Sequence, residues 1–295
     1  MMFHSLSSDQ YNKGFVLVLL SALCYGLQPF FAYFAYADGA DPIGLLVARF
    51  SLASGMMLLW LKKSSAGLPG VGQFFRTMLI GVGYAGAALG YYSASHSVSF
   101  SLAIILMFSF PAFVTLFSIL FLREALCWKK LCSLILASGG VILATDMSFK
   151  GDLNGVFWAL FAALSYGAAI LYGTHKVPSS GSLVSATIIL LGGMAAVLCV
   201  SFFQGVTWPQ TIVGWSAIAG LALFATILPI ATFISGSPHI GASRASTLST
   251  LEPLVAISIA VLLIGESLSS TMLIGGGLVV IAAVLLASSG DRKPA

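Results

Sequence analysis

Long apolar runs, separated by short polar or turn-forming stretches, repeat along the whole chain. Each run holds roughly 20 residues, which is the length that an α-helix needs to cross a bilayer. The connections between the runs contain glycine, proline and charged residues, which favour turns. We therefore predict an all-α polytopic membrane protein. Its ten expected transmembrane helices cover residues 14–37, 42–61, 74–95, 99–121, 127–145, 153–173, 182–203, 212–235, 242–264 and 270–288.

The composition also indicates a lipid environment. Of the 295 residues, 59% are hydrophobic and only 7% are charged, whereas a soluble domain carries about 25% charged residues. So few charges cannot cover a folded globule in water. The net charge of +4 comes from loops and tails rather than from one basic face, so we expect no nucleic-acid partner.

The four cysteines do not follow a metal-ligand pattern. Cys24 and Cys199 lie inside apolar runs, and Cys127 and Cys132 flank the start of a predicted helix. A zinc site needs about four converging ligands. We therefore expect free thiols, with no metal and no cofactor.

Lysine and arginine are concentrated in alternate connections. With the N-terminus placed in the cytoplasm, this distribution satisfies the positive-inside rule. Eleven of the 13 basic residues then lie on the cytoplasmic side: Lys13, Lys62, Lys63, Arg76, Arg123, Lys129, Lys130, Lys176, Arg244, Arg292 and Lys293. We therefore predict a multi-pass protein of the inner membrane with both termini in the cytoplasm.

The second half of the chain repeats the first. Leu23-Cys24-Tyr25-Gly26 matches Leu164-Ser165-Tyr166-Gly167 at an offset of 141 residues, and Phe110-Pro111 matches Glu252-Pro253 at an offset of 142. We therefore predict two five-helix repeats, over residues 14–146 and 152–288, with cytoplasmic tails at 1–13 and 289–295. Because five is an odd number, the second repeat must enter the membrane in the inverted orientation.

Inverted repeats are a design of secondary transporters, which bind their substrate between the repeats near the bilayer midplane. We therefore expect a protein that moves a small solute by alternating access. An integral-membrane transferase would need paired carboxylates or a metal cluster near a membrane face, and a channel would need a selectivity filter; neither pattern stands in the sequence. The phosphate-binding motif G-x-x-x-x-G-K-S/T is also missing from the sequence. We therefore expect no catalytic residues and no ATP-driven step.

Three segments of the second half resemble a known family: Pro238-His239-Ile240-Gly241-Ala242-Ser243-Arg244-Ala245, Leu251-Glu252-Pro253-Leu254 and Leu263-Ile264-Gly265-Glu266-Ser267-Leu268. They are similar to the second-half signature of the EamA branch of the drug/metabolite transporter superfamily. In the first half, Tyr25-Gly26-Leu27-Gln28 resembles that family's Trp-Gly-Ser-Asn, although Gln28-Pro29 departs from its Asn-Phe. The resemblance covers about residues 14–288. It implies a carrier of amino acids, related metabolites or drugs, and it names no substrate.

Two charged residues lie inside predicted helices, where each costs about 2.5–3.5 kcal/mol on insertion scales. Glu252 lies about ten residues into the ninth helix, roughly 15 Å deep at 1.5 Å per residue. It can bind a substrate amine or take up a coupling proton; alternatively, it hydrogen-bonds backbone that Pro253 leaves unpaired. Arg49 can pair with a substrate carboxylate or with Glu252; alternatively, it bonds helix-end carbonyls and snorkels outward.

Prolines stand inside several predicted helices. Pro29, Pro111, Pro229 and Pro253 each free a backbone carbonyl, which is tolerated where neighbouring helices or a cavity satisfy it. Pro111 and Pro253 occupy equivalent places in the two repeats and are candidate hinges. Gentle curvature for packing is the alternative.

Polar and aromatic residues share faces of the predicted helices. Tyr25 lies on the face of Gln28, Tyr84 on that of Tyr91, and Ser249 on that of Glu252. A cavity with aromatic walls and few polar groups suits a mostly apolar zwitterion or a cation, although simple packing stays open for each ring. The candidate substrate-binding or coupling residues are Glu252, Arg49, Gln28, Tyr25, Tyr84, Tyr91 and Ser249.

Arg244 begins the ninth helix on the cytoplasmic side. It is a candidate cytoplasmic gate, and a plain positive-inside residue is the alternative.

These patterns together predict a secondary transporter that exports an amino acid or a related compound, with protons as the candidate coupling ion. Transport of a drug, a cation or a sugar derivative by the same fold stays open. The expected partners are the small-molecule substrate and the lipid bilayer. One chain carries both repeats, so a monomer suffices, and a dimer stays open.

Overall fold

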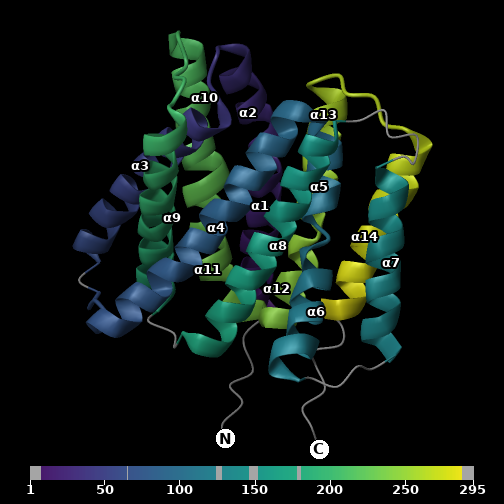
Figure 1. Cartoon of the computed structure of the whole chain (residues 1–295). Coiled ribbons are helices and arrows are strands. Elements are labelled where there is room, and N and C mark those ends of the chain that lie inside the picture. Colours follow the sequence, from purple (N-terminus) through teal and green to yellow (C-terminus); the bar gives the residue numbers. More distant parts are fainter. Residues whose placement is uncertain (1–7, 65, 124–127, 146–151, 178–180, 288–295) are drawn as a thin grey trace, which may run out of the picture.

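The computed structural model describes residues 8–64, 66–123, 128–145, 152–177 and 181–287, and these are almost entirely helical (Figure 1). The segments in chain order are α1 (Ser8–Gly26), α2 (Gln28–Ala37), α3 (Pro42–Lys63), α4 (Val71–Ser97), α5 (Phe100–Met107), α6 (Phe110–Leu122), α7 (Trp128–Ala144), α8 (Leu153–Lys176), α9 (Ser182–Gln204), α10 (Ile212–Ala222), the π-helical η1 (Leu223–Ile227), α11 (Leu228–Ile240), α12 (Ala242–Ser249), α13 (Leu251–Leu262) and α14 (Ser270–Ala287).

Segments that continue one another across a break form single rods, namely α1–α2, α5–α6, α10–η1–α11 and α12–α13. With these joined, the described chain makes ten rods, one for each predicted span. Six of the described stretches are on their own long and apolar enough to cross a bilayer. The prediction of an all-α protein with ten membrane-crossing helices is confirmed.

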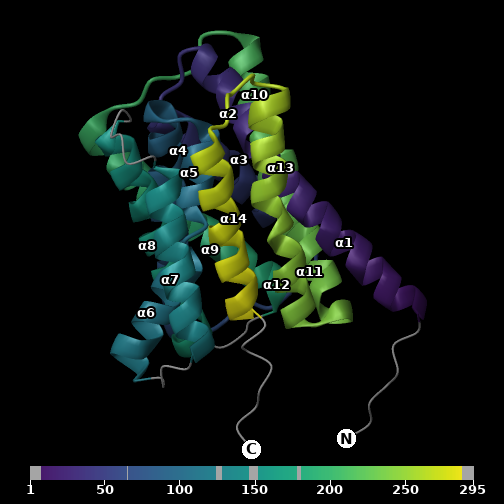
Figure 2. The ribbon, with the colours of Figure 1, turned by 90° about the vertical axis from the view of Figure 1, so that its right-hand side faces the viewer.

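The ends of the chain differ in detail from the prediction. α1 begins at Ser8 rather than at residue 14. Its first turns are polar and solvent-exposed, as at Asp9 and Lys13, so the helix continues beyond the apolar run and projects from the bundle (Figure 2). The predicted C-terminal tail and residues 1–7 lie outside the described residues.

Each broken rod carries a proline in the first turn of its later segment. Proline has no N–H and its ring clashes with the carbonyl four residues earlier, so a regular helix stops before it. The four residues are Pro29 in α2, Pro111 in α6, Pro229 in α11 and Pro253 in α13. The breaks therefore follow from local sequence.

The two halves pack against each other through equivalent pairs of residues. The first helix of each half crosses the third and fourth rods of the other half, with a glycine at each crossing that lets the two backbones approach closely. The equivalent contacts are Gly14 on His239 and Gly155 on Ser97, then Gly26 on Val255 and Gly167 on Phe113. Each pair is related by the offset of 141 or 142 residues, which is the relation that a pseudo-two-fold axis produces.

The described chain begins and ends at one end of the bundle, here called the termini end; the other is called the distal end (Figures 1 and 2). α1 runs from the termini end toward the distal end, whereas its equivalent α8 runs the opposite way. The second repeat is therefore inverted. Placement of the termini end in the cytoplasm remains a prediction.

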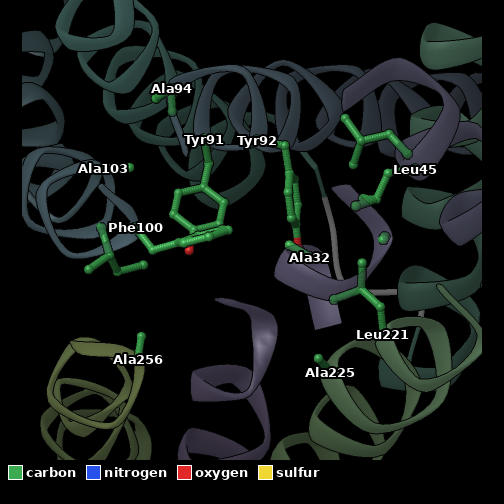
Figure 3. Packing of buried hydrophobic residues seen from close by; sticks show 14 of the residues in the cluster. Ala32, Leu45, Tyr91, Tyr92, Ala94, Phe100, Ala103, Leu221, Ala225 and Ala256 are labelled. Atoms are coloured by element: carbon green, nitrogen blue, oxygen red, sulfur yellow. The ribbon is translucent and has the colours of Figure 1, made fainter. Parts of the chain in front are cut away.

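The core lies where α4 crosses the other half. Tyr92 of α4 is fully buried, as are Leu45 of α3 and Leu221 of α10. Tyr91 and Tyr92 project side by side from α4, with Tyr91 on the side of Phe100 and Tyr92 on the side of Ala32 (Figure 3). This layer separates the centre of the bundle from its distal end.

Candidate functional site

A central cavity of about 330 Å³ lies between the two halves. This volume is at the small end of the range of roughly 300–1,000 Å³ that is usual for ligand pockets. The structure brings all seven predicted cavity residues to its wall: Glu252, Arg49, Gln28, Tyr25, Tyr84, Tyr91 and Ser249. They come from four different rods, so only the tertiary fold places them together.

The wall is largely aromatic and aliphatic. Seven rings line it: Tyr25, Phe50, Tyr84, Tyr91, Tyr92, Tyr166 and Phe233. Tyr84 and Tyr166 meet edge to face with their ring centroids 5.0 Å apart, and Phe110 supports Tyr166 at 4.6 Å. These contacts fix the orientation of the rings.

Glu252 lies in the first turn of α13, directly after the break at Thr250. The break turns the carboxylate toward the cavity, where it is partly accessible. Among the described residues its hydrogen bond comes from Gln28 Nε2 at 3.4 Å. None of its described bonds is to the backbone that Pro253 leaves unpaired, so the structure gives no support to that alternative.

Gln28 connects the two charged residues. It is the first residue of α2, after the break at Leu27. Its Nε2 donates to Glu252 Oε1 at 3.4 Å, and its Oε1 accepts from Arg49 Nη1 at 3.3 Å and from the Tyr92 hydroxyl at 3.1 Å. The structure gives no support to the option that Arg49 pairs directly with Glu252, because the Gln28 amide lies between them.

Arg49 is buried, with 7% of its surface exposed, so it does not snorkel outward. Its Nε donates to Thr226 Oγ1 at 2.8 Å, and its Nη1 donates to the Tyr92 hydroxyl at 2.9 Å. Its Nη2 lies 3.4 Å from the carbonyl of Ala225. Arg49 thus links the first half of the chain to the π-helical turn of the second half.

The cavity lies on the pseudo-two-fold axis, because its wall is made of equivalent residues from both halves. Tyr25 corresponds to Tyr166, and Met107 to Ser249, at offsets of 141 and 142 residues. The charges break this symmetry. The position equivalent to Glu252 is Phe110, so a single carboxylate defines one side of the site.

Sequence reasoning missed three residues of this site. Tyr166 could have been found, because it is the repeat equivalent of Tyr25. Tyr92 could have been found from its neighbour Tyr91, had both faces of the helix been considered. Nothing in the sequence indicated that Thr226 would bond to Arg49. That contact depends on a π-helical turn in which the Thr226 hydroxyl donates to the Leu221 carbonyl at 3.0 Å.

Glu266 closes the distal end beside the cavity. It follows the sharp turn at Gly265, whose φ of +81° suits a glycine. Its carboxylate accepts hydrogen bonds from Phe100 N at 2.6 Å, Ser101 N at 3.0 Å and Ser101 Oγ at 2.7 Å. Free amides and the helix dipole both favour an anion at the start of α5, so this contact joins the fourth and ninth rods.

Two aspartates close the distal end on its other side. Asp38 accepts from the amide of Thr211 at 2.8 Å and from its hydroxyl at 2.7 Å. Asp41 accepts from the amide of Thr207 at 3.0 Å and caps α3 through Gly44. The Thr211 amide and hydroxyl hold the pKa of the Asp38 carboxyl below its ordinary value, so this carboxylate stays ionised at neutral pH.

The termini end is more open. Cavity residues on that side, such as Ile189 of α9 and Ile234 of α11, are partly exposed, whereas Tyr91 and Tyr92 on the distal side are buried. The fourth and ninth rods pack through their distal segments α5 and α13. Their other segments, α6 and α12, do not form such a pair within the described part of the chain, and Figure 2 shows them separated.

The remaining candidates lie outside the cavity. Arg244 is exposed at the termini end, where its guanidinium lies 5.3 Å from the centre of the Tyr11 ring beside a shallow pocket. Pro111 and Pro253 follow the breaks in the fourth and ninth rods. In the described ranges, no group of three His, Cys, Asp or Glu side chains is placed to hold a metal ion.

The inverted repeats around a central charged cavity define this molecule as a multi-pass membrane transporter. The sequence profile of the EamA-like transporter family matches residues 12–145 and again residues 153–288. The chain therefore belongs to the EamA-like transporter family, within the drug/metabolite transporter superfamily, and this is a family of transporters rather than enzymes.

Several curated relatives span nearly the whole chain. A Bacillus subtilis protein named as the uncharacterized transporter YcbK is 24% identical over 90% of this chain and 89% of its own. An Escherichia coli protein named as the uncharacterized inner membrane transporter YedA is 25% identical over 86% and 85%. A crystal structure covering 97% of this chain and 99% of its own matches with a TM-score of 0.59 at 18% identity, which shows a shared fold alone.

Proposed function

We propose that this protein is a secondary transporter of the inner membrane that exports a small amine-bearing metabolite, with amino acids and related compounds as the first class to test. The observation that carries the proposal is the single cavity carboxylate, Glu252, at the interface of two inverted repeats. An ammonium group is the natural partner of a carboxylate in an apolar surrounding.

Export by alternating access is consistent with a bundle whose termini end is more open and whose distal end is held together by hydrogen bonds. Basic residues concentrate at the termini end, which supports a cytoplasmic location for that end under the positive-inside rule. The cavity is then accessible from the cytoplasm and closed toward the outside. In the reverse state the distal contacts of Glu266, Asp38 and Asp41 separate, and the termini end closes, with Pro111 and Pro253 as the hinges.

Several finer assignments belong to this proposal. Glu252 accepts a proton when the substrate leaves, which would couple export to proton entry. Arg244 contributes to closure of the termini end. A monomer suffices, because one chain supplies both repeats. Phosphate-bearing sugar derivatives fit poorly, since Arg49 is already bonded to protein groups.

Uptake into proteoliposomes tests the proposal. Purified protein is reconstituted and offered a panel of labelled amino acids and amines, with and without an acidic lumen. We expect saturable uptake of at least one compound, stimulated by the proton gradient. Folded protein that moves no compound on the panel would refute the proposed substrate class, and unsaturable flux would indicate a channel.

Replacing Glu266 by Ala should make the outer end open more often. The change removes three hydrogen bonds to the start of α5, and one such bond to a charged group contributes about 1.5–3 kcal/mol. We introduce Ala88→Cys into the cavity of a chain without its native cysteines and add an impermeant thiol reagent from the outside. The labelling rate should rise at least about tenfold.

The exposed neighbour of Glu266 provides the control. Ser267→Ala alters the same connection without touching α5, and its labelling rate should equal that of the parent chain. An unchanged rate in the Glu266→Ala chain would show that the distal contact does not hold the outer end closed.

A further inference from the structure

Two charged side chains, Arg49 and Glu252, line the cavity. They differ in how many of their hydrogen-bonding positions protein groups already use. Arg49 has five N–H groups. Four of them point at protein acceptors, on Thr226, Gln28, Tyr92 and Ala225. A substrate carboxylate would therefore find at most one free N–H, behind the side chains of Gln28 and Tyr92.

Glu252 has unused hydrogen-bond acceptor positions. A carboxylate offers about four acceptor positions, and among the described residues one donor uses them, Gln28 Nε2 at the long distance of 3.4 Å. The carboxylate also faces the cavity directly. A cation in the cavity would gain several short bonds without displacing a protein partner.

The wall around Glu252 is suited to a cation as well. Tyr25, Tyr91, Tyr92 and Tyr166 line the same cavity as Glu252. Ring faces attract an ammonium group within about 6 Å. They offer no counter-charge to an anion, so a carboxylate on the substrate would be desolvated without a charged partner.

We propose that the substrate is an organic monocation, a primary amine on an aromatic or aliphatic body. The site disfavours the corresponding amino acid, because among the described residues that line the cavity no free cationic group is available to the carboxylate. This inference rests on the proposed function, and it narrows the substrate class of the same cavity.

A second polar group near the cavity is the hydroxyl of Tyr91. Tyr91 lines the cavity, and its hydroxyl is buried without a hydrogen-bond partner in the described part of the chain. Buried hydroxyls are usually paired. A hydroxyl on the substrate body would pair with it, so hydroxylated amines should bind more tightly than their unsubstituted analogues.

Matched pairs that differ only in the carboxylate test the proposal: tyramine and tyrosine, phenethylamine and phenylalanine, isopentylamine and leucine. We measure the concentration dependence of proteoliposome uptake and of the ligand-induced rise in melting temperature in detergent. For at least one pair, the amine should be preferred at least about 30-fold over the acid, the factor expected when one charged group is left unpaired. Glu252→Gln should lose the response to the amine, and Tyr91→Phe should abolish the preference for tyramine over phenethylamine.

The outcomes separate the two proposals. If amino acids are moved as well as the amines or better, the amine inference is overturned while the proposed function stands. If neither member of any pair moves or raises the melting temperature of folded protein, both the inference and the proposed substrate class are overturned.

Discussion

Replacing Glu252 by Gln should reduce transport at least about 100-fold while leaving the fold intact. Gln has nearly the same shape and still offers an oxygen to Gln28, so packing is preserved. Among the described residues, Glu252 is the one carboxylate that lines the cavity, and we propose it as the partner of a substrate ammonium and the acceptor of a coupling proton. Removing one partner of a buried charge pair costs about 2–5 kcal/mol, and 1.4 kcal/mol corresponds to a factor of ten.

Proteoliposome uptake of the best substrate, driven by a proton gradient, checks this expectation. Asp9→Asn is the matched control, because it neutralises an acid that is exposed at the start of α1 and far from the cavity. A Glu252→Gln chain that exchanges substrate without responding to the gradient would limit the residue to coupling. Transport at the parental rate would show that Glu252 takes no part in the function.

Replacing Gly81 by Ala should be the most destabilising single-methyl change in the bundle. Gly81 of α4 faces α9 of the other half, where an added Cβ would overlap the carbonyl oxygen of Ile189. That atom belongs to a helix backbone and cannot turn aside, so the two helices must separate. Overpacking of this kind costs about 1–3 kcal/mol, and we expect the melting temperature in detergent to fall by at least about 5 °C.

Gly55 supplies the matched control. It also lies inside a helix, in α3, and an added Cβ would meet no atom within 4 Å. Ala is favoured over Gly in a helix by about 1 kcal/mol, so Gly55→Ala should leave the melting temperature unchanged or raise it. Equal effects of the two changes would mean that the close approach of α4 and α9 does not limit stability.

Much of the cavity could be predicted from the sequence. A charge inside a membrane helix is costly, so Glu252 and Arg49 had to face protein or a cavity. The helical periodicity then placed Gln28 on the same helix face as Tyr25, and Ser249 on the same face as Glu252. All seven residues selected in this way lie on the cavity wall, because in a bundle with few polar residues the polar faces must converge.

The bonding within the cavity could not be predicted. Gln28 lies between Arg49 and Glu252 only because the helix breaks at Leu27 and begins again at Gln28. Thr226 reaches Arg49 only because a π-helical turn presents its hydroxyl at that height. These relations depend on the relative height and rotation of three rods, and no local pattern encodes them.

The sequence by itself determined the number of spans, the two repeats and the inverted order, because each follows from hydrophobic run length, self-similarity and an odd number of helices. Tertiary structure alone decided how the polar groups are bonded: four N–H groups of Arg49 point at protein acceptors, Glu252 accepts one long bond from Gln28 among the described residues, and Glu266 bonds to the start of α5. The reason is that lipid solvation constrains each helix separately, whereas hydrogen-bond pairing depends on distances of about 3 Å between helices that only their packing sets.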